Sequence, residues 1–172
     1  LLFAVEETLD WYRLLYLDRK LEAWLVYMMV IAAVLPDRGV TDLLKRFPFS
    51  ERESTTLKAM RGGAHRLLRQ LSKQPPLKPS GVCRILEGVQ DEALVAIMAQ
   101  SPSERVKRLV SAYLTAWRQA KPRLTGKELQ SMGIKPGPIY GKVLTQLREA
   151  HLDGLVKTET EERSFIEKLI RR

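Results

Sequence analysis

Residues 21–35 read LEAWLVYMMVIAAVL and form the longest apolar stretch of the 172-residue chain. A helix formed by this stretch would carry apolar side chains on nearly all sides. This pattern predicts a central helix at 22–35 that is covered by neighbouring helices. With about 15 residues, an internal glutamate and a closing proline, the stretch is shorter than the roughly 20 residues that span a bilayer. It therefore predicts a globular core and no membrane attachment.

Helical periodicity continues through the rest of the chain. Residues 2–17 place Val5, Leu9 and Tyr12 on one face, and proline and glycine divide the remaining sequence into further predicted helices. We expect these helices at about 41–47, 50–71, 82–86, 91–99, 103–121, 125–132, 138–152 and 158–172. No alternating run rich in β-branched residues competes with them, so the predicted fold class is all-α.

Several residues predict where helices begin and end. Pro36, Asp37 and Gly39 are expected to end the helix at 22–35 before the next one begins. A Ser or Thr followed three positions later by Glu predicts a capping box at each of three starts: Ser50/Glu53, Thr125/Glu128 and Thr158/Glu161. Gly62 and Gly63 weaken the helix at 50–71, and the pattern there is compatible with a break or with a continuous helix.

A proline-rich segment at 73–81 is the predicted domain boundary, because proline stops helices and favours extended backbone. We therefore expect a multi-helix body at 1–72, a linker at 73–81 and a smaller basic helical tail at 82–172, as one body or two closely packed subdomains.

The net charge of +9 is concentrated in one window. Residues 105–142 contain nine basic residues and one acidic residue, Glu128. Such a window attracts a polyanion, because each neutralised phosphate releases counterions. The alternative is an ordinary solvated surface. The candidate binding residues are these nine basic residues together with Gly137, which lies in a turn within the window: Arg105, Lys107, Arg108, Arg118, Lys121, Arg123, Lys127, Lys135, Gly137 and Lys142.

The turn at 133–137 adds a second feature to this window. Glycine lets the backbone approach a ligand closely, and Pro138 is suited to the first position of the following helix, where free amides attract phosphate. The alternative is a tight turn between two helices. Likewise, Tyr140 is either a stacking platform for a base or a packed tyrosine.

The sequence predicts neither a catalytic residue nor a metal site. Nucleotidyl transfer needs paired carboxylates for metal ions, and no Asp-x-Asp occurs. The pairs Glu51/Glu53 and Glu159/Glu161 fall at predicted helix starts, where acids serve as caps. His65 and His151 are isolated, and Cys83 is the single cysteine. A chain without disulfides fits a reducing cytoplasm, where we expect this protein.

Residues 124–138, LTGKELQSMGIKPGP, resemble a block near the C-terminus of bacterial tRNA nucleotidyltransferases and related poly(A) polymerases. That block has the form G-x-D-L-x-x-L-G-x-x-P-G-P and is followed by a helix and an L-x-G segment, which is similar to LREAHLDG at 147–154. Glu128 replaces the usual Asp and Met132 the usual Leu. The specific part of the resemblance covers about 124–165.

The resemblance implies a parent enzyme that adds nucleotides to RNA 3′ ends, with Mg²⁺ and a nucleoside triphosphate bound in an N-terminal head. It implies that the helical body and tail hold structured RNA, typically the acceptor and TΨC stem of tRNA. We therefore expect a non-catalytic RNA-binding C-terminal region that lies inside a longer protein, without a signal peptide. Whether the parent adds CCA, adds A or makes poly(A) is left open, as is homo-oligomer formation.

Two other functions fit the same residues. Two helices joined by the turn at 133–138 also resemble a helix-hairpin-helix element, which would make the chain a non-specific DNA-binding module. Alternatively, the helices form a purely structural or dimerisation domain, and the basic face is only solvated.

Overall fold

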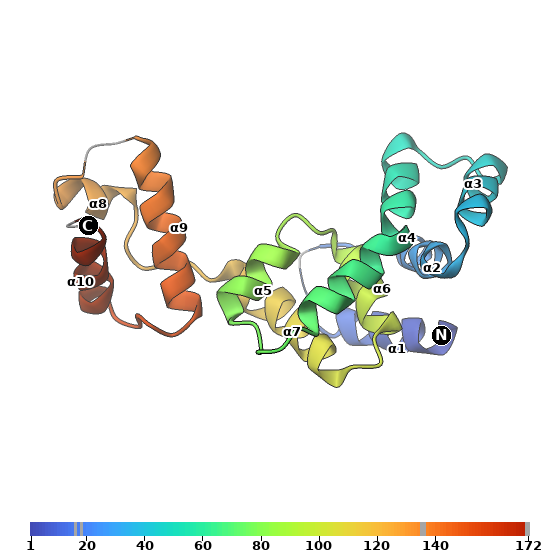
Figure 1. Ribbon diagram of the computed structural model, residues 1–172, viewed down its shortest axis with the longest axis horizontal. Coiled ribbons are helices and arrows are strands. Elements are labelled where there is room, and N and C mark those ends of the chain that lie inside the picture. The colour runs from blue at the N-terminus through green and yellow to red at the C-terminus, as the bar shows by residue number, and fades with distance from the viewer. Residues whose placement is uncertain (16, 18, 135–136, 171–172) are drawn as a thin grey trace. The chain divides into compact units, whose positions relative to one another are not determined.

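The computed structural model describes residues 1–15, 17, 19–134 and 137–170 (Figure 1). These residues form ten α-helices and one short 3₁₀ helix, and no strand occurs among them. The all-α prediction is therefore confirmed. The chain divides into two compact units: unit 1 comprises residues 1–76 and 85–111, and unit 2 comprises residues 77–84 and 112–172.

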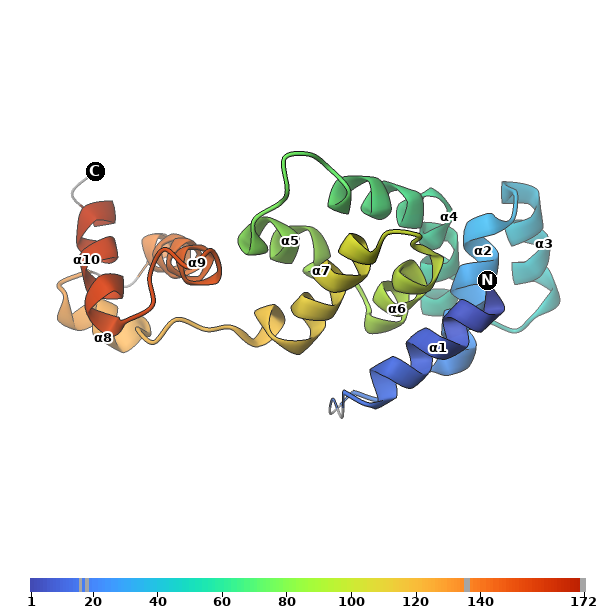
Figure 2. The same ribbon diagram turned by 90° about the horizontal axis from the view of Figure 1, so that it is seen from below.

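Unit 1 is built around three mutually packed helices. The helix at the opening stretch, α2 (Ala23–Val34), packs against α4 (Glu51–Leu71) and α6 (Asp91–Gln100). The first helix, α1 (Leu2–Arg13), lies along α6 (Figure 2). Every residue of α6 from Asp91 to Ala99 except Glu92 is buried, so α6 is more completely enclosed than α2.

A buried polar contact fixes α1 on α6. The hydroxyl of Tyr12 donates a hydrogen bond of 2.8 Å to the carboxylate of Asp91, which is itself only 7% exposed. Buried polar groups are stable when they are paired in this way. The contact therefore sets the rotation of α1 about its own axis.

The third helix, α3 (Asp37–Arg46), begins four residues before the predicted start at residue 41. Pro36 has extended backbone and stands at the cap, so the helix begins directly after it. Asp37 lies in the first turn, where a carboxylate is favourable. Gly39 does not end the preceding helix as predicted but lies inside α3, because its cost of about 1 kcal/mol relative to alanine is too small to prevent helix formation there.

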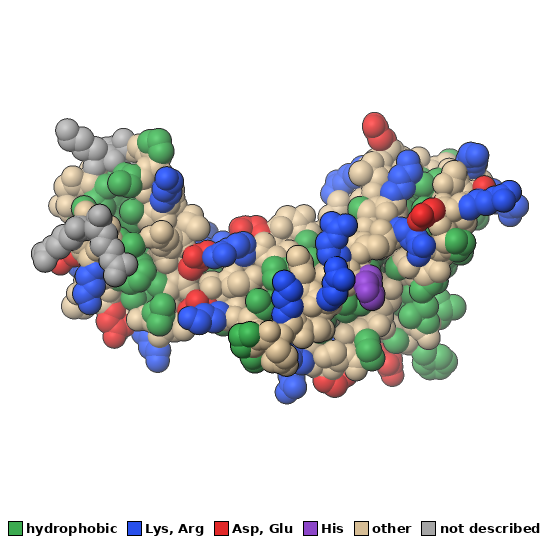
Figure 3. All heavy atoms as spheres, in the orientation of Figure 1, with side chains coloured by type: hydrophobic (Ala, Val, Ile, Leu, Met, Phe, Trp, Pro, Cys, Tyr) green, Lys and Arg blue, Asp and Glu red, His purple; other side chains and the backbone are tan. Residues whose placement is uncertain are grey.

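The helix α4 is kinked at Arg61 and Gly62. Gly62 has φ +75° and Arg61 has ψ 112°, both outside the helical region, so the break that the sequence left open is present. The predicted capping box at Ser50 and Glu53 is also formed. Basic side chains gather over α4 together with a histidine (Figure 3), and α4 contains Lys58, Arg61, His65 and Arg69 at helical spacing.

Unit 2 contains the family block and its supporting helices. Its helices are α8 (Gly126–Ser131), α9 (Pro138–Leu152) and α10 (Glu159–Ile170), and α8 and α10 both pack on α9. Their apolar faces meet in one core: Leu124, Leu129, Ile134, Val143, Leu147, Ala150, Val156 and Ile166.

The helix α5 (Pro79–Leu86) begins within the segment that the sequence predicted to be a linker. Proline is tolerated in the first turn of a helix, so Pro79 starts α5 instead of preventing it. Ser80 is held by two hydrogen bonds to Asp153, from its backbone amide at 2.9 Å and its hydroxyl at 2.8 Å. Arg84 forms an ion pair with Glu149. The non-helical part of the predicted linker is thus confined to residues 73–78.

The helix α7 (Glu104–Thr115) ends before its predicted end near residue 121 and is followed by the 3₁₀ helix η1 (Trp117–Gln119). In a continuing α-helix the carbonyl of Arg118 would accept from the amide of residue 122, but Pro122 has no N–H. The guanidinium of Arg148 donates instead, to the carbonyls of Arg118 at 3.3 Å and Ala120 at 3.2 Å.

Among the helices that the structure describes, none has the length and apolar character needed to cross a membrane.

Candidate nucleic-acid interface

The family block begins at a capped helix. The backbone amide of Thr125 donates a hydrogen bond of 2.8 Å to the carboxylate of Glu128, and the Thr125 hydroxyl also donates to that carboxylate. These bonds, from the hydroxyl first and the backbone second, lower the pKa of Glu128 below its ordinary value of 4.5. The predicted capping box is therefore present, and it fixes Gly126 and Lys127 in the first turn of α8.

A buried carboxylate positions the chain that leads into this helix. Glu162 of α10 is 0% exposed, and it accepts hydrogen bonds from the backbone amides of Arg123 at 3.0 Å and Leu124 at 2.9 Å. The Nδ1 atom of His151 lies 3.5 Å from the same carboxylate. The extended segment that carries Arg123 is thus held on α10 from within the core.

The turn between α8 and α9 depends on Gly133. Its φ of +83° lies in the left-handed region that glycine favours, and the amide of Ile134 donates back to Leu129 at 3.2 Å, closing the end of α8. Tyr140 is half-buried, and its hydroxyl donates to the carbonyl of Ile134 at 3.1 Å. Of the two roles considered for Tyr140, the structure shows the packed one.

We expect Gly133→Ala to destabilise unit 2 by about 1 kcal/mol, because alanine is strained at positive φ even though no neighbouring atom would clash with its Cβ. The matched control is Gly137→Ala. Gly137 has extended backbone with φ 164°, which any residue adopts, and open space around its Cβ position. Urea unfolding of both variants would contradict this account if Gly137→Ala lost as much stability as Gly133→Ala.

The N-terminus of α9 is exposed and uncapped by side chains. Gly137 occupies the cap position without a side-chain hydrogen bond, and Pro138 starts the helix, as the sequence predicted. The aligned peptide dipoles of this 15-residue helix place a partial positive charge there. Lys142 is exposed just over one helical turn further along. This end of α9 is electrostatically suited to an anion.

The structure divides the ten candidate residues between the units. In unit 2, four cations are exposed: Lys121, Arg123, Lys127 and Lys142. Gly137 is also exposed there, whereas Arg118 is half-buried with its guanidinium 5.9 Å from the centre of the Tyr113 ring. Lys135 lies outside the described residues. The remaining three, Arg105, Lys107 and Arg108, belong to unit 1.

Within unit 1, two of the three cations already have partners. Arg105 donates to the backbone carbonyl of Lys73 at 3.3 Å, and Lys107 forms an ion pair with Glu104 at 2.8 Å. Arg108 is exposed. A single basic surface over residues 105–142 therefore stays a prediction, and the exposed cations of unit 2 form the better-defined candidate.

The structure brings Lys121 beside the start of α8. A hollow of about 330 Å³ is lined by Lys121, Thr125 and Gly126 together with Arg148 of α9. Arg148 was not among the predicted residues, and neither was Glu162. The sequence did contain a signal for Glu162, because this acid lies on the same apolar helix face as Ile166. No local pattern indicates a role for Arg148.

An all-helical unit with exposed lysines around a tight turn between helices defines a candidate nucleic-acid-binding region. No protein-family model matches the chain. In sequence it is 33% identical over 162 residues to the A-adding tRNA nucleotidyltransferase of Geobacter sulfurreducens, a match that covers 92% of this chain and 18% of that protein. The resemblance predicted from residues 124–165 is confirmed, and it extends over nearly the whole chain.

Solved structures show the same fold. The CCA-adding enzyme of Thermotoga maritima, solved in complex with tRNA, superposes with a TM-score of 0.74 at 20% identity and covers 98% of this chain and 40% of that one. An apo form of a CCA-adding enzyme gives 0.72 at 20% identity over 97% and 38%. The chain thus spans about a fifth of its curated relative and about two fifths of these structures.

Proposed function

We propose that this chain is the RNA-binding helical region of a nucleotidyltransferase that extends RNA 3′ ends, and that it docks the acceptor and TΨC stem of tRNA. The observation that carries the proposal is the coincidence of the family block with the exposed lysines around α8 and α9. The relative adds A to tRNA, and one solved neighbour is bound to tRNA. Both are consistent with a tRNA substrate for the parent of this chain.

The proposed contacts are to the sugar-phosphate backbone. Lysine ammonium groups bind phosphates as point charges, and double-stranded RNA is recognised mainly by its shape and backbone. Lys121, Lys127 and Lys142 lie on the segment before α8, on α8 and on α9. Cations on three consecutive segments would track a phosphate backbone without reading bases.

Catalysis is assigned to other parts of the proposed parent, where Mg²⁺ and a nucleoside triphosphate would bind. In the described ranges of this chain, no group of three or more His, Cys, Asp or Glu residues has an arrangement that would hold a metal ion. The residues present here therefore do not fit the metal.

The proposal predicts strongly salt-dependent binding. With four to six phosphate contacts, affinity for tRNA should fall about 100- to 1,000-fold between 50 and 200 mM salt, because each contact returns counterions to the phosphates when it is broken. Fluorescence anisotropy with labelled tRNA measures this directly. Salt-insensitive binding, or no binding at 50 mM, would contradict the proposal.

Competition with duplex DNA tests the choice of nucleic acid in the same assay. We expect unlabelled tRNA to displace the labelled tRNA at a lower concentration than a DNA duplex with the same number of phosphates does. Equal or better competition by DNA would favour the hypothesis that the turn at 133–138 belongs to a DNA-binding helix-hairpin-helix element.

A further inference from the structure

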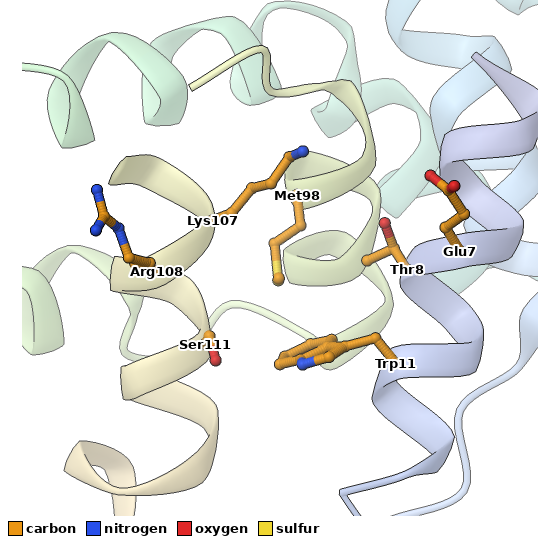
Figure 4. Close-up of a pocket in the computed structure, with 7 residues that line it drawn as sticks. All are labelled: Glu7, Thr8, Trp11, Met98, Lys107, Arg108 and Ser111. Carbon is orange, nitrogen blue, oxygen red and sulfur yellow. The ribbon is translucent and has the colours of Figure 1, made fainter. Parts of the chain in front are cut away.

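A hollow of about 290 Å³ opens in unit 1 between α1, α6 and α7. Trp11 of α1 and Met98 of α6 give it an apolar surface, and Lys107 and Arg108 of α7 border its other side. Glu7 of α1 lies at the opposite edge from α7 (Figure 4). All of these residues belong to unit 1, so the hollow is complete within one compact body.

The aromatic surface of the hollow is fixed in place. Figure 4 shows the indole of Trp11 pointing from α1 toward α7, with Met98 above it. The neighbouring Tyr12 donates a buried hydrogen bond of 2.8 Å to Asp91, which holds this part of α1 against α6. Trp11 is half-buried, so part of its surface is open to a ligand. A fixed, partly open indole is suited to stacking against a flat ring.

The two sides of the hollow carry opposite charges. Lys107 reaches over it from α7, and Arg108 is exposed beside it. The hydrogen bond and charge of Lys107, and to a lesser extent the charge of Arg108, lower the pKa of Glu104 on the same helix. Lys107 is therefore paired with Glu104, and Arg108 is the exposed cation of this side. Glu7 makes the α1 edge acidic. A ligand that matches this arrangement is anionic at one end and carries hydrogen-bond donors on a flat ring at the other.

We propose that this hollow binds one unpaired nucleotide of a bound RNA. The base stacks on Trp11, the phosphate lies beside Lys107 and Arg108, and an exocyclic amino group donates to Glu7. The inference rests on the proposed function in taking RNA as the source of the nucleotide. The recognition chemistry would be the same for a free nucleoside monophosphate.

Other ligands match fewer of these features. The volume of about 290 Å³ is at the small end of ligand pockets, so a base and its sugar fit but a duplex does not. A simple anion would leave the indole unused, whereas a neutral aromatic molecule would leave the exposed Arg108 unused. A nucleotide uses both sides.

The site can be located by NMR, because the chain has three tryptophans whose indole N–H signals report separately. We expect AMP to shift the Trp11 indole signal and to leave those of Trp24 and Trp117 in place. Adenosine, which lacks the phosphate, should bind about 10-fold more weakly, and ribose 5-phosphate, which lacks the base, should not shift the Trp11 signal. Equal binding of AMP and adenosine, or no shift with AMP, would overturn the inference.

Single substitutions measure separately how stacking and charge contribute to AMP affinity. Trp11→Leu should lower AMP affinity about 10-fold or more, because it removes the stacking surface, whereas Trp11→Phe should retain most of it. Arg108→Gln should weaken AMP binding and leave adenosine binding unchanged, because Arg108 is proposed to contact only the phosphate. The control is Trp24→Leu: Trp24 is 45% exposed in unit 1 and is not part of the hollow, so AMP binding should stay unchanged.

Two RNA ligands test whether the hollow binds a nucleotide of RNA. Their results also distinguish a failure of this inference from a failure of the proposed function. A tRNA with an unpaired 3′ extension should bind wild type more tightly than a blunt hairpin, and Trp11→Leu should remove that difference. If tRNA binds and AMP leaves Trp11 unchanged, the hollow is wrong and the proposed function stands. If AMP shifts Trp11 but tRNA does not bind, the proposed function fails and the hollow is a site for free nucleotide, which overturns RNA as its source.

Discussion

Replacing Lys121, Lys127 and Lys142 together with glutamine is expected to weaken tRNA binding about 1,000-fold at 50 mM salt and to reduce the slope of log affinity against log salt by about 2.7. Each lysine that contacts a phosphate contributes about 0.9 to that slope, and its contribution to affinity grows as salt is lowered. All three are exposed in unit 2, so their loss should not affect folding. Anisotropy titrations at several salt concentrations measure both quantities.

The same unit offers a matched control. Lys78, Lys157 and Lys168 are also exposed lysines of unit 2 but lie outside the helix-turn-helix segment at 121–142. Their triple replacement by glutamine makes the same change in net charge, and we expect it to weaken tRNA binding less than about 5-fold. Equal losses in the two triple variants would show that net charge, and not this surface, attracts RNA.

Replacing Glu162 with leucine is expected to destabilise unit 2 by about 2–4 kcal/mol. The amides of Arg123 and Leu124 would lose the carboxylate that accepts from them, and a buried donor left without a partner costs about 1–3 kcal/mol. The side chain is 0% exposed, so water does not readily replace the carboxylate. Amide resonances of unit 2, followed through urea unfolding, measure the change in that unit alone.

The control for this prediction is Glu167→Leu, because Glu167 is an exposed acid of the same helix. It should change the free energy of unfolding by no more than about 0.5 kcal/mol. Hydrogen exchange at residues 123 and 124 adds a local measurement, since both amides should lose protection in Glu162→Leu. A change in stability below 1 kcal/mol in that variant would contradict the assigned role.

Features encoded by neighbouring residues were predictable from the sequence. The capping boxes at Ser50, Thr125 and Thr158 are all present, because each needs only a hydroxyl and a carboxylate three positions apart. The turn at Gly133 likewise follows from local backbone preference, whereas the kink at Gly62 was one of two outcomes that the sequence left open.

Contacts between distant residues were not predictable in the same way. Glu162 binds amides 38 and 39 residues earlier, and Arg148 binds carbonyls 28 and 30 residues earlier. A polar side chain reveals such a partner only once the helices are packed. This is why the predicted set contains the exposed cations of the surface and lacks the two residues that shape the backbone beneath it.

The ends of three helices show the same limit. Pro36 directly precedes α3, and Pro79 is the first residue of α5. The sequence pattern suggested that both prolines would separate helices. Beyond the end of α7, Arg148 donates to the carbonyl of Arg118, for which Pro122 has no N–H to offer. Proline marks a boundary, but which side of it is helical depends on what the neighbouring backbone groups bind.

The division into units has a consequence for how this region can be inherited. The chain passes from one unit to the other three times, after residues 76, 84 and 111, and two of these passages fall inside α5 and α7. A single recombination or truncation point therefore cannot separate the units without removing the Ser80–Asp153 bonds or cutting through a helix. The two units should be gained, lost and exchanged together in evolution, as one cassette.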